Sequence, residues 1–368
     1  MNASFYMPVR VVAGRGALAR NTALLPKGRH AVIVTGRSSA RLCGALDDVV
    51  AALGAVGISY TVFDRIPENP PLLLCHEGGQ LAAKVGADLV IGIGGGSPLD
   101  AAKAIAAFAA NPTIAPAEIY DPAKRCNASL PIVAIPTTSG TGSEVNPYSV
   151  LTLPDGLQKK TFTCEASWPR VAFVDPKYTD TLPYQTTVST ALDAFAHAME
   201  SYLSPKRTVF SANAALLAAK HIWRILSARP AAFTAEMRDE LSLASTAAGM
   251  AISVTGTGFP HPLGYSLTLL DGIPHGKACA IFAGAYIAYN KKTEAGLAAL
   301  RELAAACGCT VEELEQTLPA LSEVEISLSE QEIERHVALI EGAKNYTNSP
   351  YVLSPAEMRE IYKNLFLK

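Results

Sequence analysis

Residues 88–103, DLVIGIGGGSPLDAAK, contain the pattern that decides the class of fold. A short apolar run, DLVI, predicts a buried strand, and the Ala-rich segment that begins near Ser97 predicts a helix. The glycines between them allow close backbone approach, Ser97 is suited to cap the helix, and Pro98 is suited to its first position. The exposed amides and dipole of such a helix start favour a pyrophosphate-like anion, although a glycine turn can also be only a tight turn.

The same alternation of strand and helix extends along the first half of the chain. Each of the runs HAVIVTG, ISYTVFDRI and DLVIGIGGG is followed by a longer Ala/Leu-rich run, and PIVAIP predicts a further buried strand. Repeated units of this kind build a parallel sheet with helices on its faces. VNPYSVLTL and RVAFVDPKY predict shorter β elements, with PDGLQKK as the turn between them.

Strand-like runs almost disappear after Pro176, and Ala/Leu/Glu-rich stretches dominate the remainder. The predicted helices cover residues 187–204, 208–228, 235–253, 276–290, 294–307, 311–317 and 329–342, with a last helix from Pro355. The sequence therefore predicts an α/β domain with a Rossmann-like parallel sheet at residues 1–180 and an all-helical domain at residues 181–368. We expect the active site in a cleft between these domains.

Composition excludes several classes of function. The 368 residues carry a net charge of -2, which provides no long-range field to gather nucleic acid or an anionic membrane. No apolar run reaches the roughly 18 residues of a membrane span, and the start of the sequence lacks the features of a signal peptide. The seven cysteines are scattered, which favours free thiols. We therefore expect a cytoplasmic protein that acts on small molecules.

A second stretch, STALDAFAHAMESY at 189–202, places Asp193 and His197 four residues apart. Side chains at this spacing project from one face of a helix and can close on one metal ion. An isolated pair of this kind is more often an ordinary polar pair, but His261 and His275 follow in a Gly/Pro-rich segment. These four residues form the candidate metal set. Cys279 could add a thiolate, but four harder ligands already suffice.

A second small-residue loop, PTTSGTGSE at 136–144, favours a bound nucleotide. It follows the predicted strand PIVAIP, and ligands of open α/β sheets bind at the carboxyl ends of the strands. The arrangement differs from the usual dinucleotide fingerprint, because the glycines follow the third strand rather than the first.

These motifs resemble those of the iron-containing alcohol dehydrogenase family, within the dehydroquinate synthase-like fold group. The resemblance covers nearly the whole chain and depends on the segments FYMPVRVVAGRGAL, VTGRSS, GGGSPLDAAK, PTTSGTGSEV, VDPKYTDTLP, STALDAFAHAMESYLS and HPLGYSLTLLDGIPHGKA. It implies that catalysis acts through a metal held by Asp193, His197, His261 and His275. It also implies a set of nucleotide-binding residues: Asn69, Gly94, Gly95, Gly96, Ser97, Asp100, Thr137, Thr138, Thr141, Val150, Lys160 and Leu182.

Three imidazoles and one carboxylate suit Fe(II), and also Zn(II) or another divalent ion; the resemblance favours iron. A metal with an open position would stabilise an alkoxide during hydride transfer to nicotinamide, or polarise an aldehyde in the reverse direction. The segment between His261 and His275 is longer than in some relatives and lacks a third histidine, so an extra catalytic histidine has no obvious counterpart.

The loop TGRSSAR after the first predicted strand bears on the choice of cofactor. NAD-selective relatives carry an Asp where Gly36 stands, and a carboxylate there repels a 2′-phosphate. Gly36 removes that repulsion, and Ser38 and Ser39, with Arg37 or Arg41, can hold the phosphate. The sequence therefore predicts NADP(H) in preference to NAD(H), unless the two arginines are simply solvated charges at the start of a helix.

The leading hypothesis is a metal-dependent, NADP(H)-using alcohol dehydrogenase or aldehyde reductase that acts on a small primary alcohol, diol or aldehyde. We expect a homo-oligomer, with a dimer as the first expectation. Tyr148, Phe162 and Phe259 are candidates for the substrate pocket, although aromatic residues in such places are as often core.

Two alternative functions fit the sequence less well. A dehydroquinate synthase-like lyase would need many basic phosphate-binding residues in the helical half, and the sequence shows no such cluster. A non-catalytic nucleotide- or metal-binding protein is disfavoured because all four ligands and both nucleotide loops are present.

Overall fold

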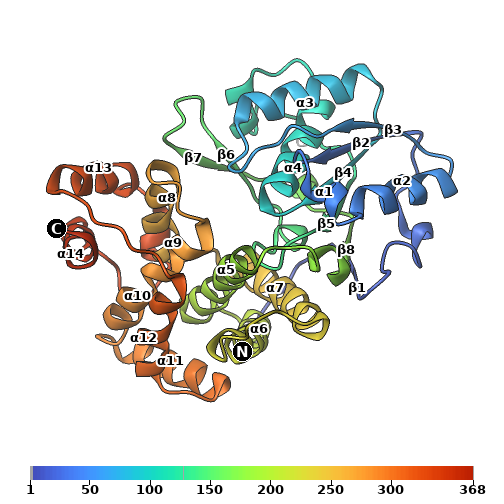
Figure 1. Ribbon diagram of the computed structural model, residues 1–368. Coiled ribbons are helices and arrows are strands. Elements are labelled where there is room, and N and C mark those ends of the chain that lie inside the picture. Colours follow the sequence, from blue (N-terminus) through green and yellow to red (C-terminus); the bar gives the residue numbers. More distant parts are fainter. Residues whose placement is uncertain (1–2, 127, 368) are drawn as a thin grey trace. The chain divides into compact units, whose positions relative to one another are not determined.

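The computed structural model describes residues 3–126 and 128–367, which form two compact units (Figure 1). The first, here called the sheet unit, consists of Met7–Leu182 and Thr234–Thr246. The second, the helical unit, consists of Met1–Tyr6, Pro183–Phe233 and Ala247–Lys368. Helix α7 (Ala235–Thr255) therefore contributes residues to both units.

The sheet unit is built on six parallel strands in the spatial order β1-β8-β5-β4-β2-β3. They are β1 (Arg10–Ala13), β2 (His30–Thr35), β3 (Ser59–Phe63), β4 (Leu89–Gly94), β5 (Ile132–Pro136) and β8 (Val171–Val174). Strands β4 and β5 are buried throughout, which explains why their sequences are continuously apolar rather than alternating.

Helices cover both faces of this sheet, and alternate strand residues pack against them. Ile33 belongs to the apolar cluster that includes helix α2, whereas Val32 and Val34 belong to the cluster that includes α3 and α4. The helices of the sheet unit besides α7 are α1 (Ser39–Leu42), α2 (Ala45–Ala55), α3 (Leu72–Lys84) and α4 (Gly96–Ala110).

A hairpin of β6 (Ser149–Thr152) and β7 (Lys159–Phe162) lies outside the main sheet. The prediction that PDGLQKK is entirely a turn was wrong in part, because Lys159 and Lys160 already pair with β6. The turn itself is short, since Gly156 has a φ of +72° and the Asp155 carboxylate accepts the Leu157 amide at 3.0 Å. Strand β7 is not evident from the sequence because two of its four residues are lysines, which are uncommon in strands.

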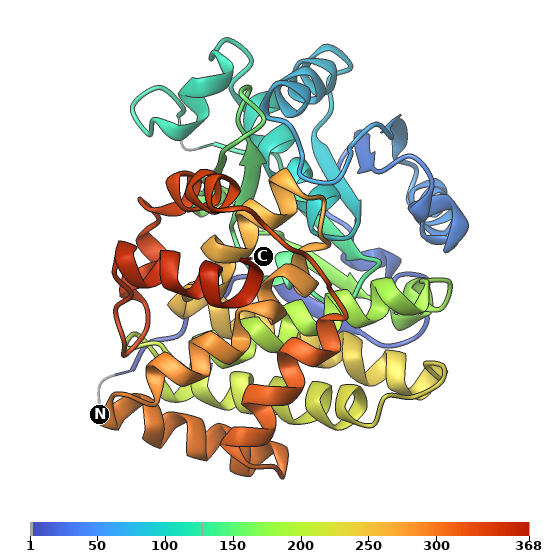
Figure 2. The same ribbon diagram turned by 60° about the vertical axis from the view of Figure 1, so that its left-hand side comes forward.

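The helical unit is organised around α5 (Tyr184–Leu203), which is buried at nearly every position from Thr187 onward. Helices α5 and α6 run side by side, as both views show (Figures 1 and 2). The remaining helices are α6 (Val209–Ser227), α8 (Pro260–Leu270), α9 (His275–Ile281), α10 (Ala283–Asn290), α11 (Glu294–Cys307), α12 (Val311–Ser322), α13 (Glu330–Ile340) and α14 (Pro355–Phe366). Short 3-10 turns lie at Thr22–Leu24, Pro116–Tyr120, Ser143–Val145, Glu165–Ser167, Pro176–Thr179 and Lys344–Thr347.

The predicted fold class, an α/β domain followed by helices, is confirmed, with corrections to individual elements. Helix α8 was not predicted, because prolines at 260 and 262 suggest a break. Both lie in its first turn, where the missing amide hydrogen has no helical partner to lose. The predicted helix 276–290 is two helices that meet at Phe282. Strand β1 was also missed, since it is a short, partly exposed edge strand.

No helix among residues 3–126 and 128–367 is long and apolar enough to cross a membrane.

The packing of α3 on α4 gives a first prediction. A Cβ added at Gly79 would lie 2.2 Å from Phe108 Cβ, so Gly79→Ala should destabilise the fold by about 1–3 kcal/mol through overpacking. Gly54 on α2 has nothing within 4 Å of its added Cβ, so Gly54→Ala should stabilise the fold by up to about 1 kcal/mol. Denaturant unfolding of both variants measures the difference, and equal midpoints would contradict this account of the packing.

Candidate functional site

The carboxyl ends of β4 and β5 bring the two small-residue loops together. Gly94 pairs with Pro136 across the sheet, and its carbonyl accepts a hydrogen bond from the Thr137 amide at 2.9 Å. Gly94 has a φ of +151°, and an added Cβ would lie 2.5 Å from the Pro98 ring. Glycine is therefore required at the point where the chain leaves the strand.

The next two glycines pack directly on the second loop. A Cβ at Gly95 would lie 3.2 Å from Thr138 Oγ1, and a Cβ at Gly96 would lie 2.8 Å from Thr141 Cγ2. The loops thus form one surface of amides and hydroxyls at the start of α4, a position suited to an anion. Six of the predicted nucleotide-binding residues meet here: Gly94, Gly95, Gly96, Thr137, Thr138 and Thr141.

Ser97 does not cap α4 as predicted, because Gly95 occupies the capping position. Its hydroxyl instead accepts a hydrogen bond from the Asn69 amide at 3.1 Å. Asn69 has a φ of +55°, and its carbonyl accepts the Thr152 hydroxyl of β6 at 3.0 Å. Asn69 therefore links the glycine loop to the hairpin.

Asp100 lies beneath the second loop and accepts the Ser143 hydroxyl at 2.5 Å and the Val150 amide at 2.9 Å. Lys103 is fully buried, and its Nζ donates to the Ser143 hydroxyl and to the Tyr148 carbonyl, both at 2.6 Å. Burial lowers the pKa of Lys103 to about 8 and raises the pKa of Asp100 above its usual range. These two residues fix the second loop and β6 to α4.

Lys103 was not singled out from the sequence. The available signal was a lysine on an Ala-rich helix, three residues after Asp100 and on a face that is otherwise apolar.

Other predicted cofactor residues lie elsewhere in the sheet unit. The Lys160 ammonium lies 4.3 Å from the centre of the Tyr120 ring, and the Leu182 carbonyl accepts Arg238 Nη2 at 3.1 Å. Gly36 directly follows β2 and is half-buried, and Ser38 and Ser39 are exposed after it. Because β2 pairs with β4, Gly36 lies at the same edge of the sheet as the glycine loop.

The three predicted substrate residues differ in their surroundings. Tyr148 is mostly buried beside Lys103, and burial raises the pKa of its hydroxyl. Phe162 is part of the apolar core of the sheet unit. Phe259 is fully buried and meets Tyr286 edge to face, with ring centres 4.8 Å apart. Their role toward a substrate stays a prediction.

Three histidines of the helical unit converge on one carboxylate oxygen. Asp193 Oδ1 lies 3.5 Å from His261 Nε2, 3.6 Å from His275 Nε2 and 3.7 Å from His197 Nε2. Ligand atoms about 2.1 Å from a tetrahedral metal are about 3.4 Å apart, so this spacing fits a single ion. Asp193 Oδ1 and His261 Nε2 are also buried without a hydrogen-bond partner among the described residues. Such atoms are costly to bury, and a metal would satisfy both.

Close approach between helices brings these ligands together. A Cβ at Gly276 would lie 1.8 Å from the Ser189 carbonyl oxygen and 2.9 Å from the Asp193 amide nitrogen, so α9 contacts the backbone of α5. Gly264 plays the same role between α8 and α9, because its added Cβ would lie 3.1 Å from Cys279 N. Each histidine motif, HPLG and HG, thus includes the glycine that positions it.

The electrostatics of this set favour a cation. Burial opposes ionisation of Asp193, but the His197 and His275 imidazoles hold the pKa of its carboxyl below the usual range. Burial likewise opposes a charged His261, yet the Glu200 carboxylate raises the pKa of His261 to about 10. The same field stabilises a metal at Nε2. His275 is the exposed member, with 30% of its side chain accessible against 3–7% for the others, so this side of the set is open.

Cys279 lies at the edge of the set, with its Sγ 3.8 Å from His275 Nε2. Ligand atoms of Asp193, His261, His275 and Cys279 all lie within 4.8 Å of one another.

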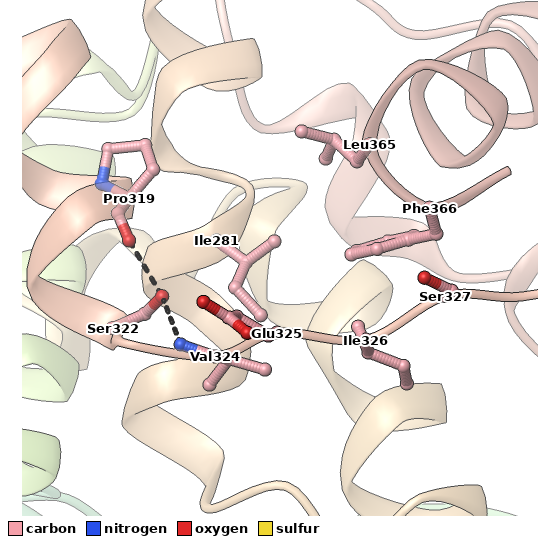
Figure 3. Close-up of a pocket in the computed structure, with 9 residues that line it drawn as sticks. All are labelled: Ile281, Pro319, Ser322, Val324, Glu325, Ile326, Ser327, Leu365 and Phe366. Atoms are coloured by element: carbon pink, nitrogen blue, oxygen red, sulfur yellow. Dashed lines mark hydrogen bonds between the residues drawn. The ribbon is translucent and has the colours of Figure 1, made fainter. Parts of the chain in front are cut away.

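A cavity of about 430 Å³ lies elsewhere in the helical unit (Figure 3). Its lining combines apolar and polar side chains and consists of Ile281, Pro319, Ser322, Val324, Glu325, Ile326, Ser327, Leu365 and Phe366. It contains none of the candidate ligands or nucleotide-binding residues, so we do not assign it to the reaction.

Comparison with known proteins matches both parts of the chain. Residues 8–176 match the model for iron-containing alcohol dehydrogenase, and residues 187–364 match the model for the C-terminal part of the Fe-containing alcohol dehydrogenase family. The chain belongs to the iron-containing alcohol dehydrogenase family. It is therefore an NAD(P)-dependent oxidoreductase acting on small alcohols or aldehydes.

Relatives in this family differ in their cofactors. The chain is 30% identical over 98% of its length to an NADPH-dependent butanol dehydrogenase of Clostridium saccharobutylicum, 97% of which is covered. An iron-containing alcohol dehydrogenase structure from Thermotoga maritima superposes with a TM-score of 0.91 at 36% identity, covering 99% of each chain. A sulfoacetaldehyde reductase from Bifidobacterium kashiwanohense, in complex with NAD+, superposes with a TM-score of 0.88 at 27% identity, again over 99% of each chain.

The backbone contact at Gly276 gives a second prediction. Gly276→Ala should separate α9 from α5, weaken binding of Zn(II) at least about 10-fold and destabilise the fold by about 3 kcal/mol. Gly342→Ala, with nothing within 4 Å of its added Cβ, is the control and should bind metal as the wild type does. Chelator competition measures the affinity. Equal metal binding by the two variants would show that the close approach is unnecessary.

Proposed function

We propose that this dehydrogenase binds Fe(II) through Asp193, His197, His261 and His275 and uses NADP(H) in preference to NAD(H). The observation that carries the metal assignment is the convergence of three imidazole nitrogens on the buried Asp193 Oδ1 within 3.5–3.7 Å. Three nitrogens and one oxygen suit Fe(II), with Zn(II) as the principal alternative. The metal would act as a Lewis acid toward the oxygen of the alcohol or aldehyde.

The residues of the chain supply the remaining requirements for hydride transfer. The loops at Gly94–Gly96 and Thr137–Thr141 offer amides and hydroxyls to a pyrophosphate. Asp100 and Lys103 hold the second loop and the start of β6 in place, so the binding surface is ordered before the cofactor arrives. The exposed side of His275 provides access for a small substrate.

The proposed preference for NADP(H) depends on the loop after β2. Gly36 places no carboxylate there, and Arg37, Ser38 and Ser39 are exposed next to it. Arg41 lies 3.5 Å from Asp64, so part of its charge is neutralised and Arg37 is the stronger candidate for a 2′-phosphate. The likeness to an NADPH-dependent butanol dehydrogenase supports the same choice. With NADPH, the reaction in the cell would be reduction of a small aldehyde to a primary alcohol or diol. We also propose that the protein is a cytoplasmic dimer.

Removal of the metal tests the first half of this proposal. Treatment with a chelator should abolish activity, and Fe(II) or Zn(II) should restore it.

His261→Ala should weaken Zn(II) binding at least about 100-fold, which is more than the loss expected for a residue that only hydrogen-bonds to a ligand. NADPH binding should persist, because the nucleotide loops belong to the sheet unit. His76→Ala, which removes a histidine of the sheet unit, is the control. Full activity after metal removal would refute the metal mechanism.

A carboxylate at position 36 tests the second half. A Cβ at Gly36 would lie 3.3 Å from the Ile66 carbonyl, so Gly36→Asp fits after a small shift. The ratio of kcat/KM for NADPH to kcat/KM for NADH should fall at least about 10-fold, because the new charge repels the 2′-phosphate. Gly54→Asp adds the same charge on an exposed part of α2 and should leave the ratio unchanged. A wild-type preference for NADH would overturn the proposal.

A further inference from the structure

A second acidic residue on α5 lies behind the metal ligands. Glu200 follows His197 by three residues and Asp193 by seven, so all three project from neighbouring positions on one helix. Its side chain is completely buried. Glu200 was not singled out from the sequence.

The contacts of Glu200 are specific. Its carboxylate oxygens lie 2.8 and 2.9 Å from His261 Nδ1, and Oε2 also accepts the Gly258 amide at 2.5 Å. Gly258 lies two residues before the start of α8, the helix that carries His261. Glu200 therefore binds both the His261 ring and the backbone at Gly258, just before the helix that carries His261.

We infer that Glu200 is a positioning residue that fixes the tautomer and orientation of His261 for metal binding. With Nδ1–H donated to Glu200, the lone pair of His261 is at Nε2, the buried atom that faces Asp193 Oδ1 and has no other partner among the described residues. A carboxylate behind a ligating histidine also makes the ring a stronger donor to the metal. This inference depends on the proposed metal set, because Glu200 touches the site only through His261.

A buried carboxylate could instead serve only to hold α5 and α8 together, and the two roles respond differently to Glu200→Gln. The amide has one acceptor oxygen where the carboxylate has two. If that oxygen accepts the Gly258 amide, the NH₂ group faces His261 Nδ1 and favours the tautomer with the proton on Nε2. That tautomer cannot bind the metal through Nε2, even though the fold keeps its shape.

The experiment compares Glu200→Gln with Glu144→Gln in the full chain. Glu144 is a suitable control because it is also a buried carboxylate, but it accepts the Thr246 hydroxyl within the sheet unit. Zn(II) affinity is measured by chelator competition, the thermal midpoint is measured on the metal-free proteins, and NADPH binding is measured by fluorescence. These readouts do not depend on turnover.

Glu200→Gln should bind Zn(II) about 10–100-fold more weakly than the wild type, with NADPH affinity unchanged. Glu144→Gln should bind Zn(II) as the wild type does. In a His261→Ala background, Glu200→Gln should cause no further loss of metal affinity, because the ring it positions is gone. A Zn(II) affinity within about 2-fold of the wild type, or an equal additional loss in the His261→Ala background, would overturn the inference.

A measurement on the wild type covers the case in which Glu200→Gln does not fold. Nitrogen-15 NMR spectra of the Zn(II)-loaded wild type and His261→Ala are compared, and the ring resonances absent from the variant are assigned to His261. Their chemical shifts should indicate a ring that is protonated at Nδ1 and bound to the metal at Nε2. The reverse assignment would refute the role of Glu200 while leaving the metal assignment intact. Absence of Zn(II) binding by the wild type would instead refute the metal site itself, and with it this role for Glu200.

Discussion

The contact between the backbones of α9 and α5 is the constraint on which the metal site depends. At Gly276 the two helices are so close that even a methyl group would overlap the Ser189 carbonyl. This approach brings His275 to within 3.6 Å of Asp193, although the two residues are 82 positions apart in the sequence (275 minus 193). Helix α8 packs closely on α9 in the same way, because a Cβ added at Gly264 would lie 3.1 Å from Cys279 N. The ligands therefore assemble because backbones meet, and their side chains need no unusual reach.

The two units differ in which groups neutralise their buried carboxylates. In the sheet unit, Lys103 lies near Asp100 and Glu144, so a cation of the chain offsets much of the buried negative charge. In the helical unit, three imidazoles lie near Asp193 and one of them, His261, contacts Glu200; imidazoles are neutral when they act as ligands. Two carboxylates and neutral rings leave a charge near -2, which a divalent ion would balance. The helical unit therefore carries the larger uncompensated negative charge, which suits a cation.

The sequence predicted most of the fold because its strongest patterns are local. Strands β4 and β5 are buried throughout and continuously apolar, and the long Ala-rich runs of α5 and α6 indicate helices. Strand β7 and helix α8 were missed because lysines and prolines occur where tertiary contacts override local preference. The four candidate ligands were predicted from spacing and resemblance, and the structure brings their ligand atoms close together. Lys103 and Glu200 were not, because their partners, Ser143 and His261, are distant in sequence and only the folded chain brings them together.

Because α7 contributes residues to both units, no single cut in the chain separates the two units. Its first half completes the sheet unit: Thr246 satisfies the buried carboxylate of Glu144, and Ser242 bonds the Ser139 hydroxyl at 3.0 Å. Arg238, from the same stretch, donates to the Leu182 carbonyl. A fragment ending at residue 182 would expose these groups without their partners. The candidate nucleotide loops thus acquire their full support only after the ribosome has passed residue 246, because residues 1–182 do not complete the sheet unit.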